Sequence, residues 1–299
     1  MRKKKEETMA DYLVKAVTTD GHLRALALDA TQTVAEAQQR HDTYGAASAA
    51  LGRTLVGTIL LSTALLKDDG EETLTTRVLG DGPVGAIVAV GTPAGTVKGY
   101  VQHPHVQLPL NTVGKIDVRR AVGKGLLAVT KDMGLKQPFT GQVPLVSGEL
   151  AEDFSYYLAK SEQIPSAVGL SVFVQANNTI GAAGGFMIQA LPGASDDELT
   201  KIEKSIRALP LISEMMRAGD TPEDILTKIF GADELKFLSK SPVAFKCDCS
   251  KERFAKSIKA LGSKEIKQMI AADHGAEAVC KFCGNKYTYS EADLRAMLA

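Results

Sequence analysis

The sequence predicts an α+β protein made of an N-terminal core domain of mixed helices and strands, a helical linker and a small C-terminal four-cysteine zinc domain. Three observations predict this division. Up to about residue 190, segments of alternating apolar and polar residues are separated by glycine, proline and asparagine, which is typical of antiparallel strands. From about residue 194, the apolar residues recur at helical spacing. All four cysteines lie between residue 247 and the C-terminus.

The composition is that of an ordinary globular protein. Of the 299 residues, 44% are hydrophobic and 23% are charged, which does not fit wholesale disorder. The longest apolar stretch, 55–66, contains glycine, serine and threonine and is shorter than the roughly 20 residues that cross a bilayer. Because 35 basic residues balance 35 acidic residues, no chain-wide charge attracts nucleic acid or an anionic membrane. We therefore expect no membrane span and no specific nucleic-acid partner.

Residues 1–9 are predicted to be a disordered leader, and Met9 is an alternative start because it opens the first strand-like pattern. Basic residues 2–5 are followed by Glu6 and Glu7, where a secretory signal would need an apolar stretch. We expect a cytoplasmic protein. In that reducing compartment, clustered cysteines more often bind metal or carry out redox chemistry than form structural disulfides.

Residues 10–193 are predicted to form the N-terminal core domain. A stretch at 46–66 has no proline and is apolar nearly all round, so it should be a buried helix. Asn177 and Asn178 lie between two apolar runs and predict a hairpin turn. The clearest strand patterns lie at 73–79, 86–90, 96–102 and 168–175.

Residues 194–240 are predicted to be a helical linker. Ser195 and Glu198 have the spacing of a capping box at the start of a first helix, which Pro210 ends. A second helix spans 211–217, and a third begins at Thr221. Helices this short are marginal alone in water, so the segment needs a neighbour to remain folded. It is either a plain connector or a conformational switch with a binding face.

The linker helices carry an apolar stripe that includes methionines. Such a stripe suits promiscuous binding, although in most proteins it is simply core. The candidate binding residues are Leu199, Ile202, Ile206, Leu209, Met215, Met216, Ile225, Leu226, Ile229 and Phe230.

Residues 241–299 are predicted to be the C-terminal zinc-binding domain. We expect a strand leading into Cys247, helices capped by Ser250 and Ser263, and a final helix capped by Ser290. Two short strands, at 277–280 and 286–289, should flank a tight turn that contains the second pair of cysteines.

The cysteine spacing is the strongest chemical signal in the chain. Cys247 and Cys249 form one short clip, and Cys280 and Cys283 form a second, followed by Gly284, which permits a tight turn. Four thiolates without histidine favour a closed structural zinc site with one ion per chain. One alternative is four unrelated buried thiols. A second is a thioredoxin-type site, but the second cysteine pair lies among short β segments and does not begin a helix, which disfavours that interpretation.

Zinc should decide whether this small unit folds. Structural zinc contributes on the order of 10–16 kcal/mol, which exceeds the net stability of a typical domain. The ion would also tie Cys249 to Cys280 across a long loop, whereas a disulfide within either clip closes only a few residues. Oxidation should therefore unfold this unit and expose the apolar surface that depends on it.

The motifs together resemble the heat-shock protein 33 family, the redox-switched bacterial holdase chaperones. The first cysteine clip is preceded by PVAF at 242–245 and followed by SKERF at 250–254, and the second clip lies further along the chain at Cys280 and Cys283. The resemblance covers nearly the whole chain from Asp11. Further matching stretches are 49–54 (AALGRT), 82–87 (GPVGAI), 117–123 (DVRRAVG), 140–143 (TGQV), 147–149 (SGE) and 183–186 (AGGF).

This resemblance implies a function as well as a fold. It implies that all four cysteines bind zinc when reduced and form disulfides with their near neighbours when oxidised, Cys247 with Cys249 and Cys280 with Cys283. It also implies that the activated chaperone dimerises and holds unfolding client proteins without ATP. A protein of this kind is not an enzyme, and the absence of a Walker motif from the sequence fits ATP independence.

Other signals are weaker. A glycine motif at 80–85 is followed by a strand pattern and so is read as a turn, while His103 and His105 are read as plain surface. The main rivals from other classes are a zinc ribbon that binds nucleic acid and a thiol-disulfide oxidoreductase. The excess of lysine in the C-terminal unit suggests the former, but a four-thiolate zinc site carries negative charge of its own.

Overall fold

The structure is a computed structural model that describes residues 10–67 and 71–298. The predicted leader, residues 1–9, lies outside the described residues. The chain divides into two compact units between Phe245 and Lys246. The predicted mixture of helices and strands is confirmed, and each unit is described by itself.

The N-terminal unit contains two β-sheets. The first has five antiparallel strands in the order β10-β1-β2-β9-β8. The turn between β8 and β9 contains Asn177 and Asn178, which confirms the predicted hairpin. Asn178 takes a left-handed conformation there, with φ 64°. The strands are β1 (Tyr12–Thr18), β2 (Leu23–Asp29), β8 (Ser166–Val174), β9 (Ile180–Ala190) and β10 (Leu235–Pro242).

The second sheet has six strands in the order β11-β5-β4-β3-β6-β7. Its pairs are antiparallel apart from β11 with β5, which is parallel. The three strands predicted between residues 73 and 102 are confirmed as β3, β4 and β5. The strands are β3 (Thr73–Gly80), β4 (Ala86–Gly91), β5 (Thr96–Val101), β6 (Gly125–Asp132), β7 (Phe139–Pro144) and β11 (Ala244–Phe245).

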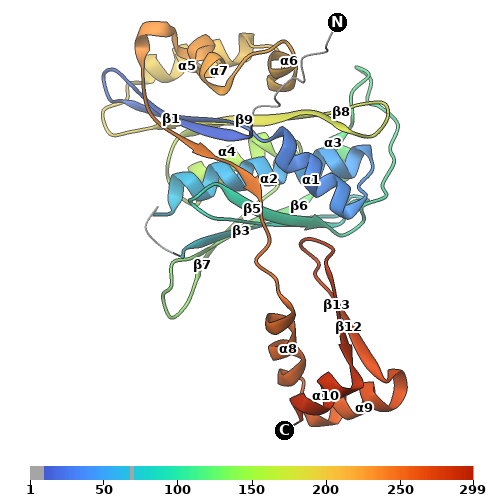
Figure 1. The fold of residues 1–299 in the computed structure, drawn as a ribbon. Helices are drawn as coiled ribbons and strands as arrows, with labels where there is room; N and C mark the ends of the chain where they lie inside the picture. Colours follow the sequence, from blue (N-terminus) through green and yellow to red (C-terminus); the bar gives the residue numbers. More distant parts are fainter. Residues whose placement is uncertain (1–9, 68–70, 299) are drawn as a thin grey trace, which may run out of the picture. The chain divides into compact units, whose positions relative to one another are not determined.

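The predicted buried helix is confirmed as α2 (Gly45–Leu65), which packs against strands of both sheets and lies between them (Figure 1). It is the one helix in the described chain long and apolar enough to cross a membrane, but 83% of its most apolar window is buried inside the protein. Small residues allow this close packing. A Cβ at Gly57 would lie 2.6 Å from the Phe154 ring. The other core helices are α1 (Thr31–His41), α3 (Val118–Val122) and α4 (Ala151–Lys160).

The predicted linker helices are α5 (Asp196–Ala208), α6 (Ile212–Arg217) and α7 (Pro222–Phe230). The capping box of Ser195 with Glu198 is present, and Thr221 caps α7 in the same way with Asp224. Figure 1 shows these helices covering the face of the five-stranded sheet that lies away from α2. The linker thus has the neighbour that its short helices need.

The prediction of helix through residue 240 is wrong for its last part. After a short 3₁₀ turn (Ala232–Glu234), the chain forms β10, which pairs along the outer edge of β1. An open edge on a strand as buried as β1 favours a pairing partner, and two lysines of β10, Lys236 and Lys240, are typical of an exposed edge strand. The strand predicted to lead into Cys247 is present as the two-residue strand β11, which ends at Phe245.

The C-terminal unit contains the hairpin of β12 (Gly275–Val279) and β13 (Lys286–Ser290) with three helices. The helices are α8 (Lys251–Ala260), α9 (Ser263–Asp273) and α10 (Glu291–Met297). Ser250 and Ser290 cap α8 and α10 as predicted. Ser263, however, is the first helical residue of α9, and the capping position is Gly262 at φ 93°, a conformation that glycine adopts at little cost.

Candidate metal centre

The four cysteines converge on one point of the C-terminal unit. Cys247 and Cys249 lie on the extended segment before α8, and Cys280 and Cys283 lie in the turn between β12 and β13. Their four Sγ atoms all lie within 4.8 Å of one another. The Cys247–Cys280 sulfur distance is 3.7 Å and the Cys249–Cys283 distance is 3.3 Å. The structure therefore joins the two clips across the fold.

Local backbone geometry holds each clip. In the second clip, the amide of Cys280 donates to the carbonyl of Asn285 at 2.9 Å, and the amide of Gly284 donates to the carbonyl of Cys280 at 2.8 Å. Gly284 has φ 73°, which confirms the need for glycine at this tight turn. Beside the first clip, the Arg253 side chain pairs with Asp248, and the backbone amide of Arg253 donates to Ser250 Oγ.

The sulfur positions fit a tetrahedral ion. Zinc bound by four thiolates at about 2.3 Å places neighbouring sulfurs roughly 3.8 Å apart, close to the spacing found here. Cys280 and Cys283 are buried, while Cys247 and Cys249 are partly exposed. A closed set of four soft ligands, with the inner pair shielded from water, suits a structural metal site.

Hydrogen bonds distinguish the thiols. Burial alone would raise the pKa of Cys249, but hydrogen bonds from Tyr287 and from the neighbouring thiols lower that pKa to about 7. Tyr287 Oη lies 3.2 Å from the sulfur of Cys249 and 3.1 Å from its carbonyl oxygen. Burial raises the pKa of Cys283. The contact with Tyr287 thus favours the ionised form of Cys249. The spacing of the cysteines gave no signal of this contact.

The second clip does not have the geometry of a thioredoxin-type site. Cys280 follows β12 directly and Cys283 lies in a turn that leads into β13, so neither cysteine begins a helix. A helix N-terminus is a feature that lowers the pKa of a catalytic thiol. The surroundings of this clip favour metal binding over disulfide exchange.

The ten candidate client-binding residues come together in a second place, within the N-terminal unit. Six are buried in one cluster with side chains of β1, β2 and β9: Ile202, Met215, Ile225, Leu226, Ile229 and Phe230. Leu199, Ile206, Leu209 and Met216 are partly buried against the same cluster. The apolar stripe is therefore core in this structure, and water does not reach most of it.

Two other groups of polar residues have structural roles. Asp20, His22 and Glu198 place ligand atoms within 4.8 Å of one another, but Glu198 is already bonded to Ser195 and to His22. His105, read from the sequence as surface, is exposed and pairs with Asp42 at 3.1 Å.

Comparison with known proteins agrees with this geometry. The family model described as Hsp33 protein matches residues 11–290. The chain is 63% identical over 291 residues to the 33 kDa chaperonin of Levilactobacillus brevis, covering 97% of this chain and 98% of that protein. It is 61% identical to the 33 kDa chaperonin of Lacticaseibacillus casei, with 97% and 99% coverage.

A solved structure supports the fold as well. The crystal structure of the 33 kDa chaperonin (heat shock protein 33 homolog) of Thermotoga maritima superposes with a TM-score of 0.90 at 38% identity, and it covers 97% of this chain and 98% of that one. A sequence match over nearly the whole chain, a matching fold and a four-cysteine centre at the positions predicted from the sequence lead to one conclusion: the chain belongs to the Hsp33 family of chaperones.

Proposed function

We propose that this protein is a redox-regulated, ATP-independent holdase that binds unfolding proteins under oxidative stress. In the proposal, residues 10–193 are the core domain, 194–240 the linker and 241–299 the redox-switch domain. The reduced form holds one zinc ion and is inactive, and oxidation of the cysteines activates it. The observation that carries the proposal is the convergence of all four thiols on one metal-sized site.

The chemistry of the switch belongs to the cysteines. Two thiols lose two electrons and two protons to one peroxide, which leaves as two waters, so two peroxides convert the four thiols into two disulfides. We propose the local pairs Cys247–Cys249 and Cys280–Cys283. Zinc, when bound, supplies a crosslink between the clips. Local disulfides remove the ligands of that crosslink without replacing it, because neither disulfide joins one clip to the other.

In the proposal, loss of the crosslink leads to exposure of the apolar face of the linker. The C-terminal unit has a small core of five buried apolar residues: Ile258, Ile266, Ile270, Tyr289 and Leu294. Such a core is too small to fold this unit without a staple. The proposal is that this unit unfolds, that the linker loosens, and that the cluster residues of α5–α7 become available to apolar segments of clients.

We further propose that the oxidised protein acts as a homodimer in the cytoplasm and binds aggregation-prone clients. It has no specific nucleic-acid partner, no membrane partner and no catalytic turnover. The 33 kDa chaperonin names of its relatives support client binding.

A combined assay tests the switch. Peroxide with mild heat should release about one zinc per chain, remove the four free thiols and give suppression of client light scattering. Mass mapping should find the two local disulfides. Metal release without any gain in client protection would contradict the switch. Salt-sensitive RNA binding by the reduced form would instead favour the nucleic-acid rival, and catalytic reduction of a disulfide substrate would favour the oxidoreductase.

A further inference from the structure

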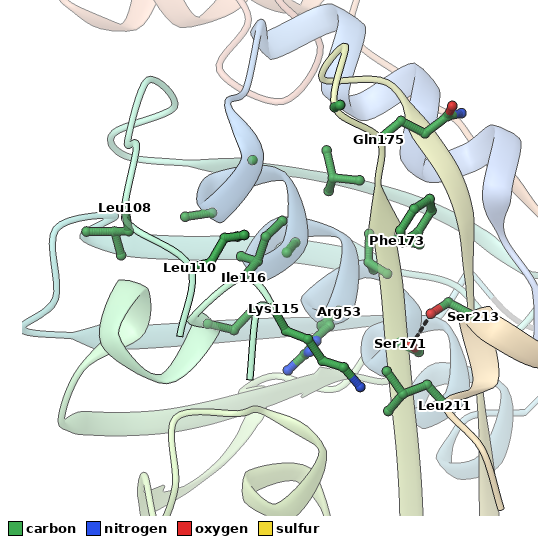
Figure 2. Close-up of a pocket in the computed structure, with 18 of the residues that line it drawn as sticks. Arg53, Leu108, Leu110, Lys115, Ile116, Ser171, Phe173, Gln175, Leu211 and Ser213 are labelled. Atoms are coloured by element: carbon green, nitrogen blue, oxygen red, sulfur yellow. Dashed lines mark hydrogen bonds between the residues drawn. The ribbon is translucent and has the colours of Figure 1, made fainter. Parts of the chain in front are cut away.

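The N-terminal unit contains a pocket of about 840 Å³ that none of the chemistry above uses. Four parts of the fold line it: the first turns of α2, the 107–118 segment before and into α3, the strand β8 with its following turn, and α6 with the residue before it. Figure 2 shows the labelled side chains of these parts around a common space. The volume lies in the range of small-molecule sites.

Most of the lining is apolar. The small residues Gly45, Ala46 and Ala49 of α2 line the pocket together with larger apolar side chains. Two of these are strongly exposed in this structure, Leu110 at 61% and Val113 at 71%. The larger apolar lining residues include Leu108, Leu110, Val113, Ile116, Phe173 and Leu211.

The charged lining is mostly positive. Arg53, Lys115 and Arg217 line the pocket, against one carboxylate, Glu214. Lys115 Nζ lies 3.6 Å from Glu214, and both side chains are about half exposed, so this ion pair is weak. Arg217 lies over the Phe173 ring at 3.9 Å. The first turn of α2 has no acidic residue, so its helix dipole adds positive potential to the same lining.

Arg53 is the best-placed cation. Its side chain is only 19% exposed, and Nη1 donates to the carbonyl oxygen and to a carboxylate oxygen of Glu149, at 2.9 and 2.7 Å. Among the described residues, Nη2 donates to none, and buried Nε has no partner. Figure 2 labels Arg53 and Lys115 among the side chains drawn around the pocket. The pocket thus joins an apolar wall to guanidinium and ammonium donors.

We propose that this pocket binds a small amphipathic carboxylate, of the medium-chain fatty-acid type, with its carboxylate on Arg53 and Lys115 and its chain along the apolar wall. Charge-assisted hydrogen bonds from a guanidinium favour a carboxylate. A cationic ligand of the same shape meets three positive side chains that outnumber the two carboxylates paired with them, Glu149 and Glu214. A neutral ligand leaves the free donor positions unpaired.

Occupancy would also affect the linker. α6 forms one wall of the pocket, while α2, β8 and the 107–118 segment form the others. A ligand that touches α6 and any of these core segments holds α6 against the core. A ligand that binds only the docked linker stabilises the docked state by mass action. This consequence, unlike the binding itself, rests on the proposed function: the carboxylate should slow activation by oxidant.

Binding can be tested on the reduced, zinc-loaded full chain with decanoate kept below its micelle-forming concentration. Calorimetry should show saturable binding of one decanoate per chain. Decanol and decylamine should bind at least tenfold more weakly, because they lack the carboxylate. Equal binding of decylamine, or uptake of several decanoates without saturation, would overturn the site.

Variants locate the site. Lys115→Glu should weaken decanoate binding at least tenfold, whereas Lys115→Arg should retain it. Lys136→Glu, at an exposed lysine that does not line the pocket, is the matched control. Arg53→Gln should also lose decanoate binding. If Arg53→Gln destabilises the fold, Leu110→Asp replaces it as the test, because Leu110 is exposed. Unchanged affinity in Lys115→Glu and Leu110→Asp would rule out this pocket.

The regulatory consequence has its own readout. Saturating decanoate should lengthen the lag before peroxide-treated protein suppresses client aggregation, and Lys115→Glu should abolish that delay. Confirmed binding with an unchanged lag would overturn the link to the linker while the site stands. A protein that never gains client protection, with or without decanoate, would overturn the proposed function, and calorimetry would still report on the site.

Discussion

His22 connects the first linker helix to the turn between β1 and β2. Its Nδ1 lies 2.9 Å from a carboxylate oxygen of Glu198 and 3.7 Å from one of Asp20. The hydrogen bond with Glu198 raises the pKa of His22. Hydrogen bonds from Ser195 and then from His22 lower the pKa of Glu198 to about 2. Both shifts favour the charged pair in the folded state.

The sign of each shift sets the pH range of this contact. Because the pKa of His22 is raised, its contribution is complete below the ordinary histidine value of about 6.5 and is lost as the pH rises through the raised value. Because the pKa of Glu198 is lowered, its contribution is present above 4.5 and is lost as the pH falls toward about 2. The contact is therefore strongest between about pH 4.5 and 6.5.

We expect α5 to be held less firmly at pH 8 than at pH 6. Amide hydrogen exchange of residues 196–208, corrected for the intrinsic pH dependence of exchange, should show lower protection at the higher pH. In His22→Gln, protection should be low at both pH values. His103→Gln, at an exposed histidine outside this contact, should keep the wild-type difference. Protection of α5 that does not change with pH in the wild type would refute the assigned role.

At the scale of elements, α5 depends on its capping box. The amide of Glu198 donates to Ser195 Oγ, and both the amide and the hydroxyl of Ser195 donate to the Glu198 carboxylate. Ser195→Ala should cost about 0.5–2 kcal/mol of local stability, seen as faster amide exchange in the first turns of α5. Ser205→Ala on the same helix is the control, since Ser205 Oγ only donates to the carbonyl of Lys201. Equal effects of the two substitutions would contradict a capping role for Ser195.

The linker helices are held mainly by apolar burial. Leu226 is fully buried in the cluster formed with the five-stranded sheet. Leu226→Ala should lower the free energy of unfolding by about 2–5 kcal/mol, measured by urea denaturation, because the cavity is only partly refilled. Under the proposed function, the reduced variant should also show partial client protection.

The matched control for this substitution is Leu238→Ala on β10, where the leucine is 56% exposed. That variant should unfold within about 0.5 kcal/mol of the wild type. If Leu226→Ala were as destabilised as expected but gave no client protection when reduced, the linker cluster would not be the surface that activation exposes.

The elements that the sequence predicts well are those specified by nearby residues. The apolar run of α2, the caps of α5 and α7, and the asparagine turn after β8 each depend on residues within a few positions, and all are confirmed. The strand β10 could not be predicted in this way. Its partner is β1, so that Pro242 pairs with Tyr12, and only the folded chain places them together.

In the candidate site, too, residues close in sequence could be predicted and contacts between distant segments could not. The four cysteines were identified from two short spacings that the chain carries locally. Tyr287, which contacts Cys249, and the pocket around Arg53 have no local signal, because each depends on segments distant in sequence. The apolar stripe of the linker was correctly placed on one face, but its periodicity alone does not show that a sheet covers it.

At the scale of the whole molecule, the two units differ in how they are stabilised. The N-terminal unit buries a long central helix between two sheets. The C-terminal unit relies on five buried apolar residues, and hydrogen bonds from Tyr287 to Cys249 and from Tyr289 to Lys251 join the segment around the first clip to the hairpin. The four cysteines bring the same two segments together at one point, where a shared metal ion would tie them.

Removing the metal should consequently unfold one unit and leave the other intact. Structural zinc supplies on the order of 10–16 kcal/mol, more than a core of this size provides. After chelation under reducing conditions, amide exchange should lose protection across residues 246–298, while α2 and the central strands β2 and β3 remain protected. Re-addition of zinc should restore the protection.

The same treatment of a variant with all four cysteines changed to serine should have no effect, since its C-terminal unit is already unfolded. A chelated, reduced wild-type chain that keeps full protection in α9 and the β12–β13 hairpin would show that the C-terminal unit folds without its metal, and oxidation would then have no unfolding to trigger.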